Sequence, residues 1–202
     1  MSNNKDWTGN KKSVFATLGA SSHGSEERQT EDFYATDPQA LRDFLNVFEL
    51  PDKKIWEPAV GKGHLADVLK EFGHEVKCSD IVDRGYEGTE LKNFLLANEK
   101  FEGSIVTNPP YKYAQDFVNK SLDSIAENHY VIMLLQLRFL ESKGRRKFFD
   151  ETPPEYVYVA SSRIDCCKNG EPLKYKGNSA VAYAWFVWRK GFYGEPKIRW
   201  FR

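Results

Sequence analysis

Asn108-Pro109-Pro110-Tyr111 brings together an amide, a rigid turn and an aromatic ring, a combination suited to chemistry on an amino group. It follows an apolar run, residues 103–106, that is typical of a buried parallel strand. Because prolines stop strands and helices, the chain must turn there. The Asn108 amide oxygen and the Pro109 carbonyl can accept hydrogen bonds from one planar amino group, and Tyr111 can stack on its ring. The pattern predicts a catalytic turn at a strand end, where open α/β sheets bind ligands.

A second pattern, further upstream, predicts a site for a nucleotide-like cofactor. Residues 54–59 form a strand pattern that runs into Gly61-Lys-Gly63 and then into an amphipathic helix pattern. The third glycine of a dinucleotide-binding loop is absent, which argues against a pyrophosphate cofactor such as NAD. Asp80 ends the next strand pattern, where a carboxylate can hold a ribose diol. Glu57, at the end of the first strand, can approach a cationic amino group.

The two patterns occur with residues 32–38 (Asp-Phe-Tyr-Ala-Thr-Asp-Pro), 57–64 (Glu-Pro-Ala-Val-Gly-Lys-Gly-His) and 184–188 (Ala-Trp-Phe-Val-Trp). In this combination the chain resembles the phage and prophage type of DNA N6-adenine methyltransferase, which uses S-adenosylmethionine (SAM). The resemblance extends over residues 14–202. It implies a class I SAM-dependent methyltransferase fold, which is Rossmann-like, with a seven-stranded, mostly parallel sheet, an antiparallel last strand and helices on both faces.

The resemblance also implies the reaction and its residues. A methyl group would pass from SAM to the N6 amino group of an adenine flipped out of DNA, with Asn108, Pro109, Pro110 and Tyr111 as catalytic residues. Family members usually carry an aspartate where this chain has Asn93, so an amide oxygen would have to accept from the SAM adenine amino group. The residues expected to bind the cofactor are Tyr34, Ala35, Thr36, Glu57, Pro58, Ala59, Gly61, Gly63, His64, Leu65, Asp80, Ile81, Asn93, Phe94 and Asn108.

Charge is unevenly distributed although the net charge is zero. Residues 1–137 carry 15 Lys/Arg and 22 Asp/Glu, whereas residues 138–202 carry 14 and 7. A basic last third predicts contact with a polyanion, and an ordinary solvated surface is the alternative. Besides Tyr111, the residues expected to meet the nucleic acid are Lys112, Arg138, Arg145, Arg146, Lys147, Arg163, Lys168, Lys174 and Lys176.

Composition limits the metal sites, the cellular compartment and the membrane segments that we expect. The three cysteines lack metal-ligand spacing, so we expect no metal site and a reducing, cytoplasmic setting. No apolar run is long enough for a membrane span, and the N-terminus has no signal-peptide pattern. We expect a monomer with a flexible segment at residues 1–28 and one methyltransferase domain at residues 29–202.

Three other functions remain open. An RNA adenine would require nearly the same pocket as a DNA adenine. Asn-Pro-Pro-Tyr also occurs in methyltransferases that act on a protein glutamine amide, although these usually carry a helical domain ahead of the SAM fold. A nucleic-acid-binding module without turnover is the alternative from another class, and the intact Glu57, Gly61, Gly63, Asp80 and Asn108 argue against it.

Overall fold

The computed structural model describes residues 34–164, 166–168 and 181–202. These residues belong to one compact unit, Phe33–Arg202. The predicted flexible segment, residues 1–28, lies outside the described residues, as does the predicted start of the domain at residue 29.

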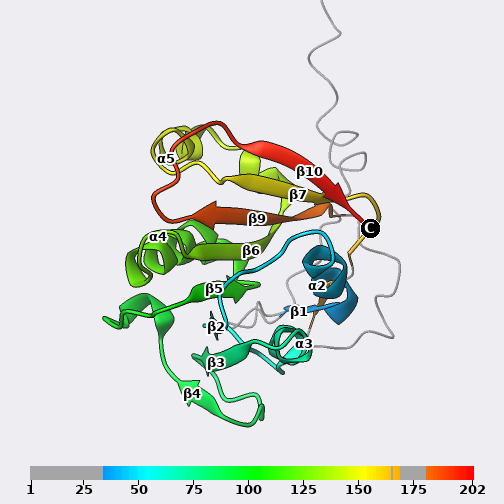
Figure 1. Ribbon diagram of the computed structural model, residues 1–202, viewed down its shortest axis with the longest axis vertical. Coiled ribbons are helices and arrows are strands. Elements are labelled where there is room, and N and C mark those ends of the chain that lie inside the picture. The colour runs from blue at the N-terminus through cyan, green and yellow to red at the C-terminus, as the bar shows by residue number, and fades with distance from the viewer. Residues whose placement is uncertain (1–33, 165, 169–180) are drawn as a thin grey trace, which may run out of the picture. The chain divides into compact units, whose positions relative to one another are not determined.

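An eight-stranded sheet forms the centre of this unit (Figure 1). Its strands are β2 (Lys54–Glu57), β3 (Glu75–Asp80), β4 (Thr89–Leu91), β5 (Ser104–Thr107), β6 (Tyr130–Gln136), β7 (Tyr156–Ala160), β9 (Tyr183–Arg189) and β10 (Lys197–Phe201). Their order is β10-β7-β9-β6-β5-β2-β3-β4. Only β9 is antiparallel to its neighbours, β6 and β7. The predicted mostly parallel sheet is confirmed.

The sheet has one more strand than the seven expected, because β10 adds to its edge beside β7. The predicted antiparallel strand is β9, which lies between β6 and β7 in the sheet. The sequence does not reveal β10, because the strand follows Pro196 and only its last residue, Phe201, is buried.

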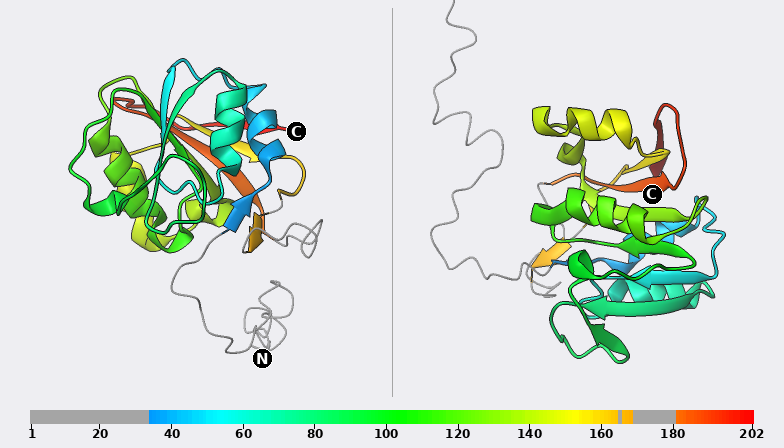
Figure 2. Two further views of the ribbon diagram at one scale, coloured as in Figure 1. Left: turned by 90° about the horizontal axis from the view of Figure 1, so that it is seen from below. Right: turned by 90° about the vertical axis from the view of Figure 1, so that its left-hand side faces the viewer.

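Helices cover both faces of the sheet (Figure 2). They are α2 (Pro38–Leu45), α3 (His64–Glu71), α4 (Ala114–Ser124) and α5 (Arg146–Glu151). Asp37 caps α2, accepting a hydrogen bond from the Gln39 N–H at 3.0 Å, and Pro38 occupies the first turn. The helix ends at Leu45, before Pro51 is reached.

Successive side chains along each strand point to opposite faces of the sheet, so the core has two layers. On β6, Ile132 and Leu134 face α2 and α3, whereas Val131, Met133 and Leu135 face α4 and α5. All five side chains are buried, which explains why the sequence reads as a continuous apolar run.

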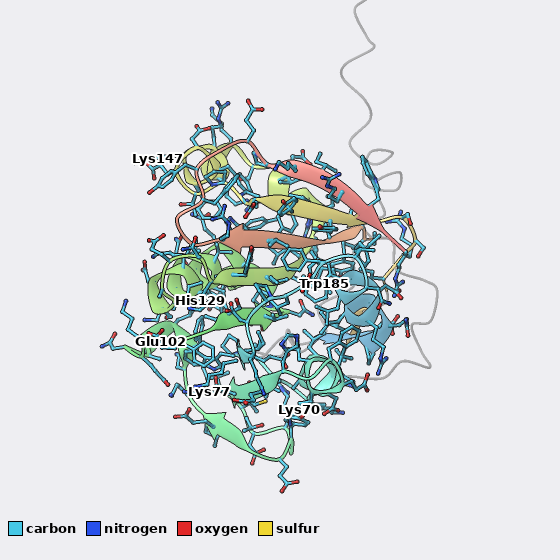
Figure 3. The ribbon with its side chains drawn as sticks, in the orientation of Figure 1. Lys70, Lys77, Glu102, His129, Lys147 and Trp185 are labelled. Carbon is cyan, nitrogen blue, oxygen red and sulfur yellow. The ribbon has the colours of Figure 1, made fainter. Side chains whose placement is uncertain are left out.

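The layer beneath α2 is centred on aromatic side chains. The Phe44 ring lies 5.2 Å from Tyr158 and 5.3 Å from Trp185, measured between ring centroids. The Trp185 indole N–H (Figure 3) donates to the Ala40 carbonyl at 3.1 Å. Phe201 of β10 packs against the same Phe44 ring, so α2 depends on strands far away in the sequence.

A second, two-stranded sheet pairs β1 (Tyr34–Thr36) with β8 (Cys166–Lys168) in antiparallel fashion. Neither strand was predicted, because three-residue strands are too short to show a period in the sequence. The pairing holds the segment that precedes α2 against the chain that follows β7.

Phe44→Ala should lower the free energy of unfolding by about 3–5 kcal/mol, because it empties a fully buried aromatic site. The matched control is Phe72→Ala, since Phe72 is 42% exposed. It should cost about 0.5 kcal/mol or less. Urea denaturation of both variants measures the difference, and similar losses would contradict this account of the core.

Candidate active site

The candidate site lies at the carboxyl edge of the parallel strands (Figure 1). Glu57 ends β2, Asp80 ends β3, Asn108 follows β5 and Gln136 ends β6. Because these strands are parallel neighbours, the four polar side chains start from the same edge of the sheet.

The Asn108 amide is oriented by β1. Its Nδ2 donates a hydrogen bond to Thr36 Oγ1 at 2.9 Å, and Thr36 is buried. Since the nitrogen of the amide is used on that side, its oxygen points to the other side. The structure thus brings two of the predicted segments together, the one at residues 34–36 and the Pro-Pro turn.

Tyr111 forms one wall of a pocket of about 430 Å³ beside the turn. Its half-buried ring packs against both core layers and lies 5.9 Å from the Tyr183 ring. Leu135 and Phe139 supply apolar surface, and polar groups approach from the following segment. The volume is in the range of small-molecule sites. The full lining is Tyr111, Ala114, Leu135, Gln136, Arg138, Phe139, Glu141, Ser142 and Arg145.

Glu57 carries a buried carboxylate with an unused hydrogen-bonding atom. Only 1% of the residue is exposed, and Oε2 has no hydrogen-bond partner among the described residues. Burial first, and then the nearby Asp80 carboxylate, raise the pKa of Glu57 well above its usual value. Such a group is costly for the protein alone and would be relieved by a cation placed against Oε2.

Asp80 binds the glycine loop directly. The Gly61 N–H donates to Asp80 Oδ2 at 2.8 Å, and the Val82 N–H donates to Oδ1 at 3.0 Å. Gly61 has a φ of 58°, in the left-handed region where a side chain is unfavourable. Each carboxylate oxygen has a second lone pair, so Asp80 can still accept from a ligand hydroxyl.

Tyr86 lies against Gly63, a contact that the sequence did not indicate. A Cβ on Gly63 would overlap the Tyr86 ring, and Gly63 has a φ of 84°. The Tyr86 hydroxyl donates to Asp67 Oδ1 at 2.6 Å and accepts from Lys70 Nζ at 3.0 Å. Gly63 therefore makes room for a tyrosine, whereas we had expected it to make room for the cofactor.

The other residues expected to hold the cofactor fall into two groups. Ile81 is 64% exposed beside Asp80, and Asn93 is exposed, with its Oδ1 accepting from the Leu95 N–H at 3.1 Å. In contrast, Phe94 and Leu65 are core residues, 2% and 3% exposed. Phe94 packs edge-on against Trp56, so its ring is directed into the protein and not to the edge.

The remaining members of that set lie near the glycine loop or in β1. Pro58 is buried and Ala59 is half-buried. His64 is half-buried at the start of α3, where burial and then Lys62 lower its pKa. Ala35 is buried in β1, and Tyr34 is paired through its backbone with Lys168.

Several cationic side chains that we expected to contact phosphate instead interact with other groups of the protein. Arg145 donates to the Phe139 carbonyl at 2.8 Å, and its guanidinium lies 4.6 Å from the Phe139 ring centroid. Arg146 pairs with Asp150, and Lys147 pairs with Glu151. These contacts place Arg145 in the pocket wall and leave Arg146 and Lys147 partly neutralised on α5.

The other expected phosphate contacts are dispersed. Arg138 lines the pocket and donates to Gln136 Oε1. Lys112 lies 5.1 Å over the Tyr113 ring and is exposed, as is Arg163. Lys174 and Lys176 lie outside the described residues, as does the side chain of Lys168.

Sequence reasoning missed Tyr86 and Gln136. Gln136 is the first polar residue after the apolar run of β6, at the edge that carries Asn108. That position was a usable signal, because strand ends at this edge face ligands. Tyr86 lies in a loop without periodicity, so nothing local marked it.

Within the described ranges, no three His, Cys, Asp or Glu side chains are placed to hold a metal ion. In the same ranges, no helix has the length and apolar character that a membrane crossing requires.

Glu57→Gln should stabilise the protein at pH 7 by about 1–3 kcal/mol, because a buried group that prefers to stay neutral is replaced by a neutral one. Since the folded-state pKa of Glu57 is raised, its protonated form favours the native state, and this contribution disappears as pH rises through that pKa. The gain should therefore vanish below about pH 3, where the carboxyl is protonated in both states.

Urea titrations at several pH values measure this gain. Glu155→Gln is the control, because it weakens the 2.7 Å ion pair with Arg189 and should destabilise the protein. A Glu57→Gln variant no more stable than wild type at pH 7 would contradict the assignment.

No family model matches this sequence, and no curated protein matches it. Solved structures do. A protein from Pyrococcus horikoshii, provisionally named as an RNA methyltransferase, has a TM-score of 0.58 at 12% identity, covering 91% of this chain and all of its own.

Two further structures agree. A protein from Listeria monocytogenes, provisionally named as a class I SAM-dependent methyltransferase, has a TM-score of 0.55 at 12% identity, over 94% of this chain and 71% of its own. The 23S rRNA methyltransferase ErmE has a TM-score of 0.51 at 21% identity, over 81% and 71% of the two chains. The chain therefore has the class I SAM-dependent methyltransferase fold.

Proposed function

We propose that this protein is a SAM-dependent methyltransferase that methylates the N6 amino group of adenine in DNA. The observation that carries the proposal is the oriented Asn108 amide, held by Thr36 at the edge of the sheet beside the Tyr111 pocket. Around it, the carboxyl edge of the parallel strands supplies Glu57 and Asp80 as candidate cofactor-binding residues.

The residues at that edge fit SAM. When bound, SAM supplies a methyl group on a positively charged sulfur, and it also carries a cationic amino group and a ribose. The buried Oε2 of Glu57 suits the amino group, because a cation there would favour the charged carboxylate. Asp80, already fixed by two backbone N–H groups, suits the ribose hydroxyls.

The turn fits an exocyclic amino group as acceptor. Asn108 Oδ1 and the Pro109 carbonyl would accept hydrogen bonds from its two N–H groups, which favours a pyramidal nitrogen with an available lone pair. Tyr111 would hold the base by stacking, with its ring already fixed between the core layers. These groups act by positioning and by oriented dipoles, and no covalent enzyme intermediate is needed.

DNA is the proposed polymer because of the resemblance in the sequence, and a single copy of the chain suffices for the groups named above. RNA is the second candidate, since two of the similar structures are named as RNA methyltransferases. The acceptor assay should therefore offer both polymers, together with a protein that presents a glutamine.

Asn108→Ala should lower the rate of methyl transfer about 100-fold or more, because an oriented dipole is lost from the transition state. The affinity for SAM, measured by calorimetry, should change by about twofold or less. Asn119→Ala, an exposed asparagine of α4, is the matched control and should behave as wild type. Product formed by Asn108→Ala at the wild-type rate would refute the proposed chemistry.

Thr36→Val should lower the turnover rate about tenfold, because it removes the acceptor that orients the Asn108 amide. Thr36→Ser keeps that acceptor and should restore most of the rate. Turnover and SAM affinity are measured separately for both variants. If Thr36→Val lost SAM affinity while turnover at saturating SAM stayed normal, Thr36 would serve the cofactor and not the amide.

A further inference from the structure

Strand β10 has an exposed apolar face at the edge of the large sheet. Ile198 and Trp200 are 54% and 67% exposed. They stand opposite Val157 and Val159 of β7, on the sheet face that α5 covers further along. Because β10 is last in the strand order, this face continues to a backbone edge that no strand of the described residues covers.

The alternate residues of β10 carry positive charge. Lys197 and Arg199 are exposed, and Lys197 Nζ lies 5.5 Å from the Tyr156 ring centroid. In the part of the chain that the structure describes, neither side chain forms an ion pair with a carboxylate. By contrast, Arg202 forms ion pairs with Asp37 and Asp43, so its charge is neutralised within the protein.

These charges indicate which of two partners could bind this edge, a second copy of the chain or a polyanion. In antiparallel pairing of two copies centred on Arg199, this residue would stand opposite its own counterpart, and directly opposed like charges destabilise a sheet. A polyanion, in contrast, would be attracted by both Lys197 and Arg199. An unpaired strand that crosses the open edge could stack a base on the exposed indole of one face and place its phosphates near the cations of the other face.

The position of β10 fits a nucleic acid already held at the active site. Because β10 is parallel to β7, its carboxyl end lies at the edge that carries Asn108. Four strand spacings separate β10 from β5. At about 4.8 Å each they span about 19 Å, which is about six nucleotides if the unpaired strand keeps the stacked rise of about 3.4 Å per nucleotide.

We propose that β10 is an accessory binding surface for unpaired nucleotides, with Trp200 stacking on a base and Lys197 and Arg199 contacting phosphates about six nucleotides from the target base. This inference rests on the proposed function, because it assumes that the strand bound at β10 is the one that enters the Tyr111 pocket. It extends that function by naming single-stranded flanks as part of the substrate.

The test uses the full chain and labelled single-stranded DNA with one adenine, flanked by either two or eight nucleotides on each side. Binding is measured by fluorescence anisotropy without SAM. Trp200→Ala should weaken binding of the long oligonucleotide at least about fivefold and leave the short one unchanged, whereas Trp200→Phe should stay close to wild type. Tyr193→Ala, 88% exposed in the turn before β10, is the control and should have no effect.

A second variant tests the charges. Arg199→Gln should reduce the slope of log affinity against log salt for the long oligonucleotide by about 0.7. Unchanged affinity of Trp200→Ala for the long oligonucleotide would overturn the proposal, as would an equal loss on both lengths. A wild-type dimer in sedimentation that dissociates in Trp200→Ala, with binding unaffected, would overturn it in favour of self-association.

Methyl transfer is assayed separately, so the two proposals can fail independently. If wild type methylates adenine but Trp200→Ala binds normally, only the β10 surface is wrong. If no acceptor is methylated while binding still depends on Trp200, the proposed reaction is wrong and the surface stands.

Discussion

The orientation of one amide is the constraint on which the proposed site depends. An asparagine side chain presents a donor and an acceptor that differ little in shape, so its environment must decide which of them faces the substrate. Here the environment is Thr36, buried in a three-residue strand that exists only because β8 pairs with it. The proposed catalytic turn thus depends on two segments that lie outside the large sheet.

The same edge of the sheet carries features that fit the proposed cofactor site but do not stabilise the fold. Glu57 is buried without a partner for one oxygen, and Gly61 and Gly63 hold left-handed backbone conformations. The unpaired buried carboxylate opposes folding, the two backbone conformations restrict the loop to glycine, and neither feature is needed to build the sheet. The opposing terms are concentrated at the end of β2, whereas the interior of that strand, with Ile55 and Trp56 fully buried, is a normal core. Along β2, the residues that stabilise the fold are therefore separate from the neighbouring residue proposed to bind the cofactor.

Much of this architecture could be predicted from the sequence, because the central strands are long, fully buried apolar runs and the α2 cap is a local signal. The positions of Glu57, Asp80 and Asn108 at one edge follow from parallel pairing. What local patterns could not give were contacts set by tertiary packing: β1 with β8, Tyr86 on Gly63, and Phe94 turned into the core. The charge pattern showed an excess of cations but not that Arg145 would bind carbonyl groups of its own segment.

The dependence of α2 on β9 and β10 has a consequence for how the chain reaches its fold. The helix emerges early in synthesis, yet its apolar stripe packs on Trp185 and Phe201, and Arg202 pairs with its cap residue, Asp37. Contacts this distant in sequence close late and slow folding. A nascent or proteolysed chain that stops before β9 would expose Phe44 and its neighbours. Such fragments should be held by chaperones or aggregate, whereas chains extending through β10 should fold without them.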